Sequence, residues 1–136
     1  MGTNDAFKFR VVMTSAMEPD ELIGKYILVG IIFLDKEGRV VEQFQTYGPV
    51  VLVDDNKGIV LEKTDGSGNF CIPPDLNSLR PAPKGQYRLR STGEILDDPD
   101  FISTWTVEKT RVDTIEEYKR SGFANFDPRQ TPSKGH

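Results

Sequence analysis

Apolar residues recur along this chain in short runs with a period of two, which is the pattern of β-strands rather than of helices. The segment Tyr26–Leu34 is apolar on both alternating faces and rich in Ile, Val and Phe, so it predicts a central strand. Gly30 in its middle predicts a bend or bulge, a feature of barrel strands. The alternation over 7–13 predicts an earlier, half-buried strand, and Pro19 predicts a helical turn between the two.

Two hairpins are predicted to follow directly. The turn at 35–38 ends in Gly38, which is available for a positive φ, and the turn at 54–58 ends in Gly58 in the same way. Gly48-Pro49 predicts an interruption between the hairpins, because proline cannot donate to a strand ladder. The strands predicted here cover 39–47, 50–53 and 59–63.

The second half of the chain predicts more short strands and one helix. Pro73-Pro74 should end a strand over 70–72, and a single helical turn is expected at 75–79. Thr114 and Glu117 form a capping-box pattern, and Gly122 is expected to end the helix in the left-handed conformation. Two further strands are predicted at 86–90 and at 101–109, the latter with Phe101, Trp105 and Val107 facing inward.

These patterns predict a mainly β fold: a small antiparallel SH3-like barrel or curved sheet with a short C-terminal helix. Truncation of Trp105 or Ile31 to alanine is expected to cost about 2 to 5 kcal/mol of stability, as for core residues. The predicted organisation is an N-terminal strand and helical-turn extension (1–24), a β-barrel domain (25–112), a C-terminal helix (113–122) and a largely disordered tail (123–136). Phe123 and Phe126 are expected to pin this tail to the barrel rather than to dock in a neighbouring subunit, and a homo-oligomer stays an open alternative.

One set of segments resembles the first four strands of Sm-like and related small SH3-type barrels: the stretch 22–29, the acidic turn near Asp35, Gly48-Pro49-Val50, and the stretch 54–61. Sm-like proteins bind single-stranded RNA in a ring through an Asp and an Asn in one loop and an Arg-Gly pair in a second motif. Asp54, Asp55 and Asn56 resemble the first motif. Residues 71–76 contain no Arg-Gly pair, so the chain departs from the family there.

A later part of the chain, 73–107, resembles small uncharacterised bacterial proteins. The resemblance is carried by Pro73-Pro74-Asp75-Leu76, the stretch 85–93, Asp98-Pro99-Asp100-Phe101 and Trp105-Thr106-Val107. It implies a compact bacterial β-domain and no particular activity.

Charge and composition narrow the function classes. Seventeen Lys and Arg against twenty-one Asp and Glu give a net charge of −4, which disfavours non-specific binding of nucleic acid. The longest apolar run, Tyr26–Leu34, is far shorter than the roughly 20 residues of a membrane span, and Cys71 has no second cysteine for an internal disulfide. We therefore expect a cytoplasmic protein that does not enter a membrane.

No catalytic or metal-binding motif is recognisable. One cysteine and one histidine cannot build a zinc site, and Cys71 lacks a histidine to activate it as a nucleophile. The acidic group Glu94, Asp97, Asp98 and Asp100 is a candidate for a carboxylate-dependent hydrolase, but Asp98-Pro99-Asp100 is more typical of a turn. The sequence thus predicts a non-enzymatic protein with no metal and no cofactor.

The most suggestive cluster is basic: Arg80, Lys84, Arg88 and Arg90. Arg88 and Arg90 are expected on one strand face, opposite Tyr87 and Leu89, where guanidinium groups could bind an anion or an acidic partner. The alternative is that these residues form a solvated strand face without a binding function, paired with Asp97, Asp98 or Asp100.

The leading hypothesis is therefore a non-enzymatic binding or protein-interaction module that recognises a protein or peptide. The alternative is single-strand nucleic-acid binding by an Sm-like barrel, in which Tyr47, Phe70 or Tyr87 would stack on bases. Both hypotheses use the basic residues as contacts.

Overall fold

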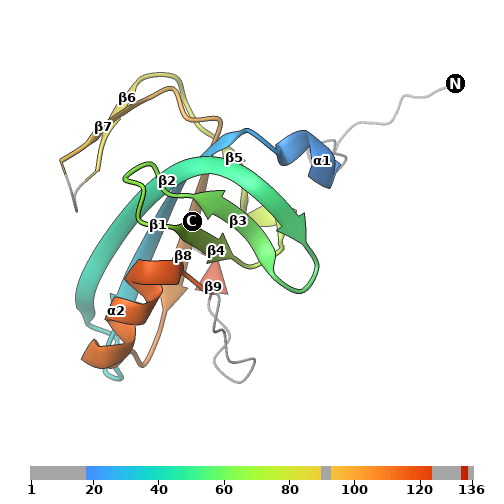
Figure 1. The fold of residues 1–136 in the computed structure, drawn as a ribbon. Helices are drawn as coiled ribbons and strands as arrows, with labels where there is room; N and C mark the ends of the chain where they lie inside the picture. Colours follow the sequence, from blue (N-terminus) through green and yellow to red (C-terminus); the bar gives the residue numbers. More distant parts are fainter. Residues whose placement is uncertain (1–17, 90–92, 124–132, 135–136) are drawn as a thin grey trace, which may run out of the picture.

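The computed structural model describes residues 18–89, 93–123 and 133–134. The strand predicted over 7–13 lies outside the described residues. The elements are α1 (Pro19–Leu22), β1 (Tyr26–Leu34), β2 (Val40–Asp54), β3 (Gly58–Glu62), β4 (Asn69–Ile72), the 3-10 turn η3 (Leu76–Ser78), β5 (Arg80–Pro81), β6 (Gln86–Arg88), β7 (Ile95–Asp97), β8 (Phe101–Val107), α2 (Val112–Ser121) and β9 (Ser133–Lys134) (Figure 1).

The mainly β fold with a curved sheet and a short C-terminal helix is confirmed. The main sheet has the strand order β4-β3-β2-β1-β8-β5, with β9 pairing against β8 beside β5, and β6 and β7 form a second, two-stranded sheet. Among the described residues the main sheet stays open, so the fold is the curved sheet of the prediction and not the closed barrel. One pair departs from the antiparallel expectation, because β1 and β8 run parallel.

The strand β2 is one continuous element through Gly48-Pro49, so the predicted interruption is wrong. Its first part pairs with β1 up to Pro49, and its last part pairs with β3 from Val50 onward, where the register shifts. In Figure 1, β2 follows a long arc. Gly48 lies where the strand passes closest to its neighbour: a Cβ there would stand 1.9 Å from the carbonyl oxygen of Glu62. Glycine at this position therefore serves a close backbone approach rather than a turn.

The predicted bend or bulge at Gly30 is also absent from the β1–β2 ladder. The register runs unbroken through the pair of Gly30 with Gln45, and the irregularity falls between Phe33 and Leu34 instead. A Cβ at Gly30 would meet nothing within 4 Å. Gly30 is thus an ordinary ladder position.

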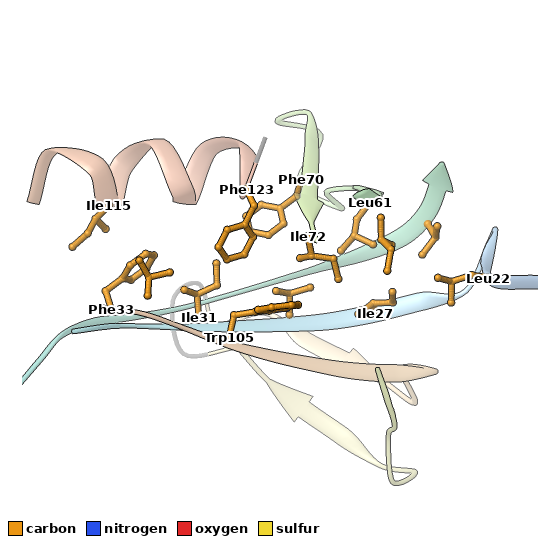
Figure 2. Close-up of a cluster of buried hydrophobic side chains, with 14 residues drawn as sticks. Leu22, Ile27, Ile31, Phe33, Leu61, Phe70, Ile72, Trp105, Ile115 and Phe123 are labelled. Atoms are coloured by element: carbon orange, nitrogen blue, oxygen red, sulfur yellow. The ribbon is translucent and has the colours of Figure 1, made fainter. Parts of the chain in front are cut away.

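The main core lies on one face of β1 and β8, beneath β3, β4 and α2. Figure 2 shows its side chains between α2 and β4 on one side and the strands β1, β2 and β8 on the other. Ile31 is 1% exposed and Trp105 is 3% exposed, as expected for core residues. The indole Nε1 of Trp105 donates to Ser103 Oγ at 2.9 Å, so the buried ring leaves no polar atom without a partner.

A second, smaller cluster lies on the opposite face of the sheet, under the β6–β7 hairpin. Tyr87 and Leu89 share one face as predicted, and they pack there with Leu96 of β7, a strand that the sequence did not predict. The buried members of this cluster are Leu28, Tyr47, Leu89 and Leu96.

The helix α2 begins two residues before the predicted cap. Arg111 is the N-cap, and the hydroxyl of Thr114 donates to the Arg111 carbonyl at 2.7 Å, so the predicted capping box is wrong. Gly122 ends the helix with φ +69° and ψ −132°, which is a positive φ but not the left-handed helical conformation. The next amide, Phe123 N–H, donates to the carbonyl of Cys71 at 2.8 Å and ties the helix end to β4.

The tail is fixed to the body of the protein at two points. The ring of Phe123 packs against Trp105 and Tyr118, with centroid separations of 5.7 and 5.2 Å, as the self-pinning prediction expected of this residue. Phe126 lies outside the described residues. Ser133–Lys134, within the segment expected to be disordered, pairs with β8 as β9.

Candidate functional site

The predicted basic residues lie in different elements. Arg80 stands in β5 at the edge of the main sheet, Lys84 in the following connection, and Arg88 in β6 of the small sheet, and all three are exposed. Within 18–89, 93–123 and 133–134 none of the three has a carboxylate within 4 Å. Arg90 lies outside the described residues. In this part of the chain, therefore, no ion pair supports the alternative that Asp97, Asp98 or Asp100 neutralises the basic face.

In the acidic candidate cluster, the carboxylates of Asp98 and Asp100 accept hydrogen bonds from backbone amides. Asp98 Oδ1 accepts from the amide of Gly85 at 2.7 Å, and Asp100 Oδ2 accepts from the amide of Tyr26 at 2.9 Å. These bonds tie the β6–β7 hairpin and the start of β8 to their neighbours, as expected for a turn. Glu94 lies elsewhere, beside Tyr47, so the structure does not bring these carboxylates together as a pair.

The aromatic residues considered for base stacking are packed inside the protein. Phe70 is fully buried in the main core and Tyr47 is buried in the second cluster. Tyr87 is half-buried, and its hydroxyl donates to the carbonyl of Pro83. None of these three rings is presented as an open stacking surface.

Two further sequence candidates have structural roles. Asp54 Oδ1 accepts from the amides of Asn56 and Lys57 at 2.7 and 2.9 Å, which shapes the β2–β3 turn and holds the pKa of Asp54 below its ordinary value. Cys71 is half-buried in β4, and desolvation raises the pKa of its thiol, so the neutral form is favoured. In the part of the chain that is described, no group of His, Cys, Asp and Glu is arranged to hold a metal ion.

A pocket that the sequence did not reveal opens beside the end of α2. It has a volume of about 220 Å³ and is formed by β2, the β3–β4 turn, the β6–β7 turn and α2. Its walls are Phe44, Gln45 and Thr46; Lys63, Thr64 and Asp65; Leu89 and Glu94; and Lys119. Each element contributes at most three residues, so no local motif marks the site.

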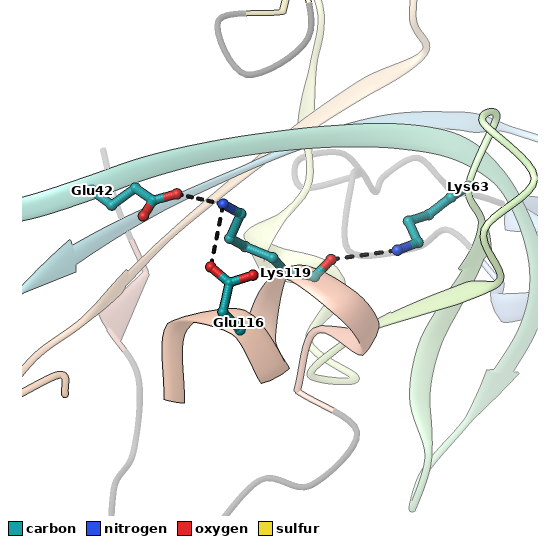
Figure 3. Close-up of polar contacts among 4 residues, drawn as sticks. All are labelled: Glu42, Lys63, Glu116 and Lys119. Atoms are coloured by element: carbon teal, nitrogen blue, oxygen red, sulfur yellow. Dashed lines mark hydrogen bonds and ion pairs between the residues drawn. The ribbon is translucent and has the colours of Figure 1, made fainter. Parts of the chain in front are cut away.

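Lys63 is the unusual member of the pocket wall. The residue is only 7% exposed, and its Nζ donates to the carbonyl of Arg120 at 2.8 Å and to that of Lys119 at 3.4 Å. Figure 3 shows the side chain reaching from the end of β3 to the C-terminal end of α2. These carbonyls have no partner within the helix, and the negative end of the helix dipole favours a cation. Lys63 thus caps α2.

Lys119 is a second cation that lines the pocket. Its Nζ contacts Glu42 Oε2 at 2.8 Å and Glu116 Oε2 at 3.7 Å (Figure 3). It also lies 5.9 Å from the centre of the Phe44 ring. The hydrogen bond to Glu42 is the main cause of a raised pKa for Lys119. This ammonium is therefore already paired.

Glu94, in the β6–β7 turn, brings a carboxylate to the pocket that is hydrogen-bonded to two hydroxyl groups. Glu94 Oε2 accepts from the hydroxyl of Tyr47 at 3.1 Å and from that of Thr64 at 3.4 Å. Burial is the main cause of a raised pKa for Tyr47, so its phenol stays a hydrogen-bond donor at neutral pH. The pocket is thus lined by both a buried cation, Lys63, and a carboxylate, Glu94.

No family model, curated protein or solved structure matches this chain. Within the described segments, no helix has both the length and the apolar character needed to span a bilayer.

The signal that could have pointed to the pocket is weak. Lys63 follows directly after β3, in which Ile59 to Leu61 are all buried, and a buried lysine there is unusual because lysine is seldom buried without a partner. Only the fold shows that its partner is a helix end 57 residues further along the chain.

Proposed function

We propose that this protein is a non-enzymatic interaction module that binds an acidic protein or peptide through exposed cations near the β6–β7 hairpin. The observation that carries the proposal is that Arg80, Lys84 and Arg88 are exposed and, within the described residues, have no carboxylate within 4 Å. Guanidinium groups left free in this way can form bidentate hydrogen bonds with carboxylates of a partner.

Two observations favour a protein partner over single-stranded nucleic acid. The net charge of −4 opposes a polyanion, and Tyr47, Phe70 and Tyr87 are packed in the two clusters rather than offered to bases. A carboxylate-based hydrolase is disfavoured, since Asp98 and Asp100 already accept backbone hydrogen bonds.

The test is affinity capture from source-organism lysate with and without nuclease, followed by mass spectrometry. The double variant Arg80→Glu/Arg88→Glu is compared with Lys36→Glu/Lys57→Glu, which changes two exposed lysines in the other hairpin turns and lowers the net charge by the same amount. We expect a stoichiometric protein that survives nuclease, binds the lysine variant and is lost with the arginine variant.

Two results would overturn the proposal. Equal loss with both variants would show only a response to net charge, and equal retention would show that these arginines make no contact. Recovery of RNA or DNA that disappears on nuclease treatment and at raised salt would instead favour the Sm-like alternative.

A further inference from the structure

The pocket beside α2 contains a buried cation whose charge is incompletely balanced. Lys63 is 7% exposed, and within the described residues no carboxylate lies within ion-pair distance of its Nζ. Buried charges are normally paired, because an isolated ammonium loses its hydration without compensation. The two carbonyls of α2 occupy two of the three N–H donors, which leaves one donor for another group.

The other ammonium of the pocket, that of Lys119, is not available to bind an added anion. Lys119 is held by Glu42 and Glu116, so its charge is neutralised inside the protein. Two acids lie close to Lys63 along the chain: Glu62 is exposed, and Asp65 Oδ1 accepts from the amide of Ser67 at 2.9 Å in an exposed turn. Hydrogen bonds from Ser67 are the main cause of a lowered pKa for Asp65, and the charge of Lys63 is only a smaller cause. An added anion would therefore find its complement at Lys63.

We propose that this pocket binds a small monocarboxylate of amino-acid or hydroxy-acid size, with the carboxylate at Lys63. The ring of Phe44 and the side chain of Leu89 offer an apolar surface for an aliphatic part of the ligand. Thr64 and Glu94, which also line the pocket, offer hydrogen-bonding groups for a hydroxyl or amino substituent.

Size and charge distinguish this ligand from larger or more highly charged ones. A volume of about 220 Å³ lies below the range of roughly 300 to 1,000 Å³ typical of pockets for larger ligands. A phosphate group usually draws on several backbone amides or on arginine, whereas Lys63 supplies one donor and the carboxylate of Glu94 also lines the pocket. A single carboxylate suits this arrangement. The inference does not depend on the interaction proposed for Arg80 and Arg88, which lie outside the pocket wall.

The direct test is an NMR titration of the full chain with L-leucine, L-glutamine and 2-hydroxyisovalerate, and with acetate as the minimal anion. L-leucinamide serves as the matched control, since it keeps the side chain and amino group but lacks the carboxylate. We expect saturable shifts of the amide signals of Lys63, Thr64, Glu94 and Lys119 with at least one of the three larger acids. We expect acetate to bind more weakly, and loss of the carboxylate to weaken binding about tenfold to a hundredfold, as for a charge-assisted hydrogen bond.

Two results of this titration would overturn the inference. One is the absence of any saturable shift at the pocket with all three larger acids. The other is binding of leucine and leucinamide with equal affinity, because the carboxylate would then play no part.

A variant provides an independent check. Lys63→Met removes the ammonium, and Lys57→Met removes an exposed lysine of the β2–β3 turn as a control. Provided that Lys63→Met melts cooperatively, it should lose the response to the acids while the control keeps it, and an unchanged response would refute the assignment. If loss of the helix cap unfolds Lys63→Met, the comparison of leucine with leucinamide on the unaltered protein still decides.

Discussion

At the scale of single residues, two glycines in strand interiors should respond differently to alanine. Gly48→Ala places a Cβ 1.9 Å from the Glu62 carbonyl oxygen, whereas Gly30→Ala places one in open space. We expect Gly48→Ala to destabilise the fold by about 3 kcal/mol, as for overpacking against a backbone that cannot yield. Gly30→Ala should be neutral or stabilising by up to about 1 kcal/mol, because alanine suits a strand better than glycine. Urea unfolding of both variants measures the difference.

Equal effects of the two substitutions would show that the close approach of β2 to β3 is misplaced. The sequence predicted a bend or an interruption at each of these glycines, and neither prediction is correct, because the ladder runs through Gly30 and β2 continues through Gly48. Ile31 and Trp105, in contrast, could be assigned to the core from the local sequence, Ile31 as part of a wholly apolar strand and Trp105 by alternation, and both are buried. The burial of Ile31 and Trp105 follows from the local sequence pattern. The role of Gly48 depends instead on Glu62, which lies next to it only in the folded protein.

At the scale of elements, the β2–β3 turn should make stability depend on pH through Asp54. Backbone amides of Lys57 and Asn56 hold the pKa of Asp54 below its ordinary value of 3.8. The carboxylate therefore stabilises the folded state above the unfolded pKa, and this contribution is lost as the pH falls through the lower folded pKa. We expect Asp54→Asn to be less stable than the wild type near neutral pH and equal to it at about pH 2.

The urea midpoints of Asp54→Asn and of its exposed neighbour variant Asp55→Asn, measured at both pH values, provide the check. A pH-independent deficit in Asp54→Asn would show that the carboxylate's charge is not what stabilises the turn. Both hairpin turns could be predicted from the sequence because Asp and Gly specify them locally. The strand β7 could not, because its three residues, Ile95–Asp97, directly precede Asp98-Pro99 and resemble a loop until Leu96 is seen to pack on the sheet.

At the scale of the whole molecule, the two apolar clusters predict two levels of stability. The β6–β7 hairpin is held largely by Leu89 and Leu96 over one face of the sheet, whereas the main core includes residues of five strands and of α2. Leu96→Ala should cost about 2 kcal/mol and speed amide hydrogen exchange in β6 and β7 while β1 and β8 stay protected. Uniformly faster exchange in all four strands would show that the hairpin and the core unfold as one unit.

Neither the parallel pairing of β1 with β8 nor the pocket could be predicted from the sequence. Parallel neighbours are usually joined by a crossover helix, and the chain between these two strands instead forms most of the sheet. The pocket combines residues from Phe44 to Lys119, which no spacing rule connects. Local patterns therefore predicted the fold class and most elements, but not how distant segments meet.

The parallel pair also has a consequence for synthesis on the ribosome. Tyr26 and Asp100, which mark the start of this contact, are 74 positions apart, so β1 emerges long before its partner β8 exists. During that interval the most apolar segment of the chain can pair with β2 but keeps its other edge open to any extended polypeptide nearby. The nascent chain should therefore depend on chaperones more than the finished protein does, and release from them should coincide with the emergence of β8.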